Sequence, residues 1–217
     1  MLPVLTALVV GAGQTIALRS HLDVLAPIAA ELPARGGNTG GFWGLTRGVA
    51  VVVIGGVLVL GRGWAGLGLH ESIPDLGVVV GLLLIAAGWL VLAIRLDYHD
   101  HPHVHPSVSH EHIHAHRGGS QIHDHDRPGF GMARSVVTAG NLAAAVPALA
   151  LEVTPALLYL VTYLAATTTS MAVFGYWLGA SKRRGDDSGW VARGQSAVAG
   201  AALVVGALWV IERWPLG

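Results

Sequence analysis

The sequence predicts an all-α fold, a polytopic transmembrane helical bundle, from three observations. Hydrophobic residues make up 53% of the 217 residues. Charged residues make up only 12%, against about 25% in an average soluble domain. Apolar stretches of about 20 residues, the length that crosses the hydrocarbon core of a bilayer, recur along the chain. A soluble domain of this length could not bury that much apolar surface.

About six spans are expected. The first apolar stretch, 2–30, is overlong and is interrupted by Arg19, His21 and Asp23. It is either one long span or a span over 2–18 followed by an interfacial helix over 24–31. The fourth stretch contains Pro147 and is closely followed by Glu152. The expected spans cover residues 2–30, 42–61, 75–95, 132–151, 155–179 and 191–211.

The spans group as three, a long loop and three. This divides the chain into a first three-helix membrane half, a histidine-rich loop and a second three-helix half, at residues 1–96, 97–131 and 132–217. An odd number of spans per half would make any duplication an inverted repeat. Ala12-Gly13-Gln14 resembles Ala139-Gly140-Asn141. Pro27 with Glu31 resembles Pro147 with Glu152, but at a different spacing, so a duplication and its absence both stay open.

The placement of arginine and lysine predicts the orientation in the membrane. Arg62 and Arg213 lie on one side, and ten basic residues lie on the other. Because cytoplasmic loops carry an excess of basic residues, we expect a multi-pass protein of the cell membrane with outward termini and a cytoplasmic histidine-rich loop. The ten residues are Arg35, Arg47, Arg95, Arg117, Arg127, Arg134, Lys182, Arg183, Arg184 and Arg193.

Two weaker patterns concern helix packing. Tryptophans near the ends of the expected spans, such as Trp43 and Trp209, favour interfacial positions, whereas Trp89 is expected to pack within the bundle. Three GxxxG pairs indicate close approach of helices: Gly44/Gly48, Gly77/Gly81 and Gly175/Gly179.

The loop between the third and fourth spans is the strongest chemical signal. Ten of the twelve histidines lie there, mostly at every second residue and with carboxylates between them. Imidazole suits nickel, cobalt, zinc and copper. We expect a flexible segment, neither a helix nor a strand, that gathers several imidazoles around one ion. A solvated linker and a pH sensor are the alternatives. The candidate ligands are His99, His101, His103, His105, His110, His112, His114, His116, His123 and His125.

Polar residues inside the spans form a second candidate site, because ionisable groups in a bilayer are costly and often functional. His21 and Asp23 are candidate metal ligands, and Arg19 is placed to pair with Asp23 at i, i+4. Alternatively, Arg19 to Asp23 mark the end of the first span. The candidate pathway residues are Gln14, Thr15, Arg19, Arg47, Asn141 and Glu152.

Two of these polar positions carry specific expectations. Arg47 is expected to extend to the cytoplasmic surface, with pairing to Asp23 or Glu152 inside the bundle as the alternative. Glu152 could cap the outer loop or guard a pathway. Asn141 and the run 167–170 favour hydrogen bonds between helices.

Several function classes are disfavoured. No P-loop, GxSxG or HExxH motif is present, so we do not expect an enzyme. The net charge of zero gives no footprint for nucleic acid. The absence of cysteine excludes thiolate ligands. The expected partners are the lipid bilayer, divalent transition metal ions and, as a possibility left open, further copies of the chain; no tightly bound cofactor is expected.

A family resemblance is carried by the stretch from Leu157-Leu158-Tyr159-Leu160-Val161-Thr162-Tyr163-Leu164 through Gly175-Tyr176-Trp177-Leu178-Gly179, which is the best preserved, and by three motif stretches. The motif stretches are Thr15-Ile16-Ala17-Leu18-Arg19-Ser20-His21-Leu22, Trp43-Gly44-Leu45-Thr46-Arg47-Gly48, and Val136-Val137-Thr138-Ala139-Gly140-Asn141-Leu142-Ala143. With the placement of the loop, they resemble the H-A-x-x-P-D-H-L, W-G-L-G-H-[TS] and G-L-V-H-G-L-A motifs of the nickel/cobalt permease superfamily, in particular its branch of six-span efflux and urease-accessory membrane proteins. Arg47 stands at a histidine position of the family.

The resemblance implies a permease for divalent transition metal ions, nickel or cobalt, with efflux favoured because the loop is expected in the cytoplasm. The ion would pass from the loop to a pathway near His21, Asp23 and Gln14. Two alternatives stay open. One is a membrane protein that binds metal as a sensor, buffer or accessory protein without transporting it. The other is a permease for an anion or small solute, which Arg19 and Arg47 facing a common cavity would favour.

Overall fold

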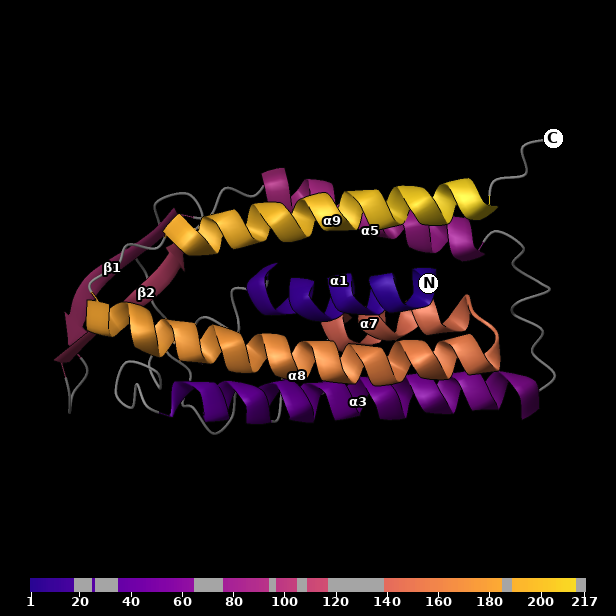
Figure 1. The fold of residues 1–217 in the computed structure, drawn as a ribbon, viewed down its shortest axis with the longest axis horizontal. Helices are drawn as coiled ribbons and strands as arrows, with labels where there is room; N and C mark the ends of the chain where they lie inside the picture. Colours follow the sequence, from indigo (N-terminus) through magenta and orange to yellow (C-terminus); the bar gives the residue numbers. More distant parts are fainter. Residues whose placement is uncertain are drawn as a thin grey trace.

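The computed structural model describes residues 1–17, 25, 35–64, 76–93, 97–104, 109–116, 139–184 and 189–213. Within this part of the chain the helices lie roughly parallel to one long axis, and a β-hairpin lies at one end of the bundle (Figure 1). The elements are α1 (Leu2–Ala17), α3 (Gly36–Trp64), α5 (Leu76–Ala93), β1 (Asp97–Val104), β2 (Ser109–His116), α7 (Ala139–Leu149), α8 (Val153–Arg184) and α9 (Gly189–Arg213).

Four of these helices are long and apolar enough to cross a membrane: Gly36–Arg62, Leu76–Ala93, Val153–Ala180 and Trp190–Arg213. They confirm the helices expected at 42–61, 75–95, 155–179 and 191–211. Many of their large apolar side chains are exposed, Trp89 among them at 64%. Contiguous apolar surface of this kind marks contact with lipid or a partner. The fold is that of a helical membrane protein. Trp89 was expected to pack within the bundle, but its side chain faces outward.

The remaining two helices are short. The described part of α1 has 16 residues and α7 has 11, with Pro147 inside it. At 1.5 Å per residue they measure about 24 Å and about 16 Å, less than the roughly 30 Å of a hydrocarbon core. The rest of the first expected span, apart from the buried Leu25, lies outside the described residues, as do residues 132–138 of the fourth.

Glycine allows the long helices to pack in close antiparallel pairs. Where α3 crosses α8, a Cβ atom on Gly44 would lie 2.7 Å from the Thr167 carbonyl oxygen. Where α5 crosses α9, a Cβ atom on Gly81 would lie 2.7 Å from the Gly206 carbonyl oxygen. Both distances are too short for any side chain, so the tight packing expected from Gly44/Gly48 and Gly77/Gly81 is confirmed.

Helix α1 lies between these two pairs and is joined to both by hydrogen bonds (Figure 1). Thr15 Oγ1 and Ser170 Oγ on α8 are 2.7 Å apart. Trp209 Nε1 on α9 donates to Thr6 Oγ1 over 2.7 Å, and the Trp209 side chain is only 1% exposed. Trp43 is likewise buried. Both rings therefore pack inside the bundle, which is the alternative to an exposed interfacial ring.

The first part of the histidine-rich loop is a two-stranded antiparallel hairpin rather than an irregular segment. Asp97 pairs with His116, and successive pairs follow through Val104 and Ser109. The expectation of neither helix nor strand is wrong here, because a histidine at every second residue is the strand period itself. His105, His123 and His125 lie outside the described residues.

Candidate functional site

Helices α1 and α7 meet inside the bundle, and their contact is polar. Gln14, near the end of α1, donates from Nε2 to the Gly140 carbonyl oxygen of α7 over 2.7 Å. Gln14 Oε1 accepts a hydrogen bond from the Tyr163 hydroxyl of α8, also over 2.7 Å. Polar residues held inside a membrane bundle are costly and commonly mark a functional site. The junction of α1 and α7 is therefore the candidate site within the membrane.

Arg47 extends this polar junction to α3. Its Nη2 donates to Asn141 Oδ1 over 2.8 Å. The Arg47 side chain is 2% exposed and Asn141 is fully buried. The expectation that Arg47 extends to the surface is wrong. The alternative partner Glu152 is also wrong, because Glu152 is exposed in the connection between α7 and α8. Asp23 lies outside the described residues.

The electrostatic character of the junction is positive. Among the described residues of the helices and of the α7–α8 connection, only Glu152 and Glu212 carry carboxylates, and both are exposed. The guanidinium of Arg47 therefore has no carboxylate partner within that part of the chain. This arrangement favours a negative charge and opposes a bare divalent cation.

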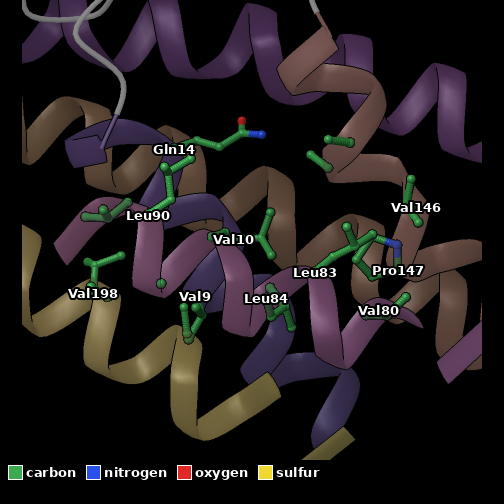
Figure 2. A pocket seen from close by; sticks show the side chains of 18 of the residues that line it. Val9, Val10, Gln14, Val80, Leu83, Leu84, Leu90, Val146, Pro147 and Val198 are labelled. Carbon is green, nitrogen blue, oxygen red and sulfur yellow. The ribbon is translucent and has the colours of Figure 1, made fainter. Parts of the chain in front are cut away.

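A cavity of about 510 Å³ adjoins the junction between α1, α5, α7 and α9. Its walls are aliphatic except for Gln14 and Gln195 (Figure 2). Gln14 lies at the cavity edge in Figure 2 and also holds Gly140 and Tyr163, so it belongs to both the cavity and the polar junction. The volume falls within the range of small-molecule sites, which are mostly apolar with a few polar groups.

The sequence analysis did not identify Tyr163 and Gln195 as candidates. Tyr163 is fully buried, and Gln195 is 8% exposed. Tyr159, one turn before Tyr163, is fully buried too and donates from its hydroxyl to the Ala144 carbonyl oxygen over 2.7 Å. The available signal was the i, i+4 pair of tyrosines within an apolar span, since a buried phenol hydroxyl needs a partner.

The far end of α7 is held by a different arginine. Arg62, near the end of α3, donates from Nη1 to the Leu149 carbonyl oxygen over 2.7 Å and from Nη2 to the Leu151 carbonyl oxygen. A cation at the last carbonyls of a helix satisfies unpaired acceptors and complements the dipole. Arg62 therefore fixes the end of α7 that is remote from Asn141.

The hairpin register places most of the predicted metal ligands on one face of the ribbon. Residues alternate between the two faces of a strand, and direct partners share a face. One row therefore contains, in order, the pairs Asp97/His116, His99/His114, His101/His112 and His103/His110. We call these eight positions the histidine face. The other face carries Tyr98, Asp100, Pro102, Val104, Ser109, Glu111, Ile113 and Ala115.

The described side chains form no further candidate metal site. Among the side chains that the structure describes, no three histidine, aspartate or glutamate residues gather as a metal site. The hairpin side chains are outside that set, and so are Arg19, His21 and Asp23. Of the predicted pathway residues, Gln14, Arg47 and Asn141 meet at the junction, Thr15 bonds to Ser170, and Glu152 lies apart.

Comparison of the chain with protein-family models, with curated protein sequences and with solved structures gave no match. The class that the fold defines is a helical membrane protein, with a polar junction between α1, α3, α7 and α8 inside the bundle. The resemblance to nickel/cobalt permeases, drawn from short motifs, stays a prediction.

Proposed function

We propose that this chain is a membrane permease for a divalent transition metal ion, which it captures on the histidine face of its hairpin. The observation that carries the proposal is the register of β1 and β2, which aligns three histidine pairs and His116 on one face. The polar junction within the bundle supports a transport function, since polar groups inside a membrane bundle commonly mark the path of a substrate.

The capture chemistry follows from the spacing. Direct partners across an antiparallel pair have Cβ atoms about 5 Å apart, and successive pairs on one face are about 7 Å apart. Two neighbouring histidine pairs can therefore supply up to four imidazoles to one ion. Nickel, cobalt and zinc all accept such ligands, and the resemblance favours nickel or cobalt. Capture on the cytoplasmic side, as the arginine bias predicts, favours efflux.

A specific observation favours the second candidate, a membrane protein that binds metal without transporting it. Arg47 stands at a position where the resemblance expects histidine, and it is buried at the polar junction without a carboxylate partner among the described helices. That charge opposes passage of a divalent cation. In this case the hairpin would serve as a metal buffer or sensor.

Nickel and cobalt flux into proteoliposomes containing the purified chain separates the two candidates. Alanine at six histidines, at 99, 101, 103, 110, 112 and 114, tests the histidine face, and the variant Asp100→Ala/Glu111→Ala, on the opposite face, is the matched control. We expect flux that falls in the first variant and persists in the control. Tight binding of nickel with no flux would select the non-transporting protein. Unchanged nickel binding in the six-alanine variant would refute capture on the histidine face.

A further inference from the structure

The first step concerns the charge of Arg47. Its guanidinium is 2% exposed, and its hydrogen-bond acceptor, Asn141 Oδ1, is a neutral oxygen. A buried cation without a countercharge is strongly unfavourable, because the interior of a membrane bundle screens charge poorly. Glu152 and Glu212, the two carboxylates among the described residues of the helices and of the α7–α8 connection, are exposed, so neither compensates Arg47. Within that part of the chain, the positive charge of Arg47 is not offset.

The second step concerns unpartnered donors. Arg47 Nε is buried and makes no hydrogen bond, and the hydroxyls of Thr167 and Thr168 on α8 are in the same state. These threonines lie against α3 beside Arg47. A Cβ atom on Gly48 would be 3.0 Å from Thr167 Cγ2, and one on Gly44 would be 2.8 Å from Thr168 Cα. Buried donors that have no hydrogen-bond partner within a native protein indicate an ion or a water molecule that accepts their hydrogen bonds.

The third step concerns α7. Asn141, the partner of Arg47, lies in the first described turn of this helix and is fully buried. Its amide oxygen accepts a hydrogen bond from the guanidinium but carries no net charge, so it does not offset the charge of Arg47. The guanidinium therefore favours a ligand with a negative charge.

We propose that the junction at Arg47 and Asn141 binds one small monovalent anion, such as chloride or formate. One monovalent anion matches the single positive charge of Arg47. The site stands independently of the histidine face and of metal transport. If both operate in one protein, the bound anion cancels the charge of Arg47, and this removes the electrostatic obstacle to a divalent ion near the junction.

The test is the thermal stability of the full chain in detergent, with chloride replacing gluconate at constant ionic strength. A ligand that binds only the folded state raises Tm, by about 5–10 °C at 100-fold its dissociation constant for a chain of this size. We expect a saturable rise with chloride and with formate. Equilibrium binding of radioactive chloride should saturate at one ion per chain.

Two variants and one control make the test specific. Arg47→Met should abolish the dependence on chloride. Asn141→Asp places a carboxylate on the guanidinium, so it should keep the fold while removing the dependence, and it carries the test if Arg47→Met does not fold. Arg62→Ala removes another arginine of the same helix and should keep the dependence. A wild-type Tm that ignores chloride, or an Asn141→Asp variant that still responds to it, would overturn the proposal, as would loss of the response in Arg62→Ala.

Discussion

Arg47 on α3 and Asn141 on α7 are joined by a hydrogen bond of 2.8 Å that lies wholly inside the bundle. Replacing Asn141 by leucine leaves the guanidinium without this acceptor. We expect the free energy of unfolding to fall by about 2–3 kcal/mol, because hydrogen bonds to buried charged groups contribute about that much. Equilibrium unfolding of the purified protein in mixed micelles measures the loss.

The double variant Arg47→Met/Asn141→Leu provides the control for this pair. Removing both partners eliminates the uncompensated charge, so the double variant should be more stable than Asn141→Leu alone. Strictly additive losses would show that the two side chains do not interact.

The crossing of α3 and α8 at Gly44 gives the second prediction. Gly44→Ala places a methyl group 2.7 Å from the Thr167 carbonyl oxygen, so the helices must separate. We expect a loss of about 1–3 kcal/mol, the usual cost of overpacking. Gly56→Ala on the same helix is the matched control, because a Cβ atom there meets nothing within 4 Å. Equal effects of the two substitutions on Tm would contradict the packing described for α3.

Arg62 gives the third prediction, on the end of α7. Arg62→Ala removes the donors that satisfy the carbonyl oxygens of Leu149 and Leu151. The expected loss is about 1–2 kcal/mol, from two hydrogen bonds and the interaction with the helix dipole. Arg193→Ala, which removes an exposed arginine from α9, should leave Tm unchanged. Hydrogen exchange of the α7 amides, faster in Arg62→Ala alone, would locate the effect.

The fourth prediction is the pH dependence of metal binding. Only the neutral imidazole has a lone pair for a metal, and an unperturbed histidine has a pKa of about 6.5. Nickel affinity should therefore be high above pH 7 and should fall as the pH decreases through about 6.5. Binding of nickel at lower pH should release protons from the histidines. Calorimetric titration at pH 7.5 and pH 5.5 checks this. Affinity that is the same at both values would exclude histidine as the main ligand.

The hairpin register gives the fifth prediction, which the absence of native cysteine makes straightforward to test. His101 and His112 are direct partners, whereas Ile113 belongs to the opposite face from His101. The double variant His101→Cys/His112→Cys should form a disulfide under mild oxidation, since facing Cβ atoms lie about 5 Å apart. The variant His101→Cys/Ile113→Cys should not. Mass spectrometry of peptides under non-reducing conditions distinguishes the two.

The hairpin shows how a clear pattern can be misjudged. Alternation of histidine with other residues is a strand period, but both sets are largely polar, so the usual contrast of apolar and polar faces was missing. In a soluble strand one face is buried, and this contrast sets the register. In this hairpin the register instead places the histidines on one face. The period of two by itself was sufficient to predict the two strands.

The sequence by itself determined that this protein lies in a membrane and where its four long helices run. Length and apolar content are local properties, and a bilayer demands about 20 apolar residues wherever a helix crosses it. Only the tertiary structure decided which polar residues meet. Arg47 could have extended to water, but it is buried and donates to Asn141 on α7, a helix distant in sequence. The tertiary structure also decided which side of a uniformly apolar helix faces outward, as at Trp89, and which side faces the core, as at Trp209. Apolar residues on all sides of a helix give no periodicity that would indicate this.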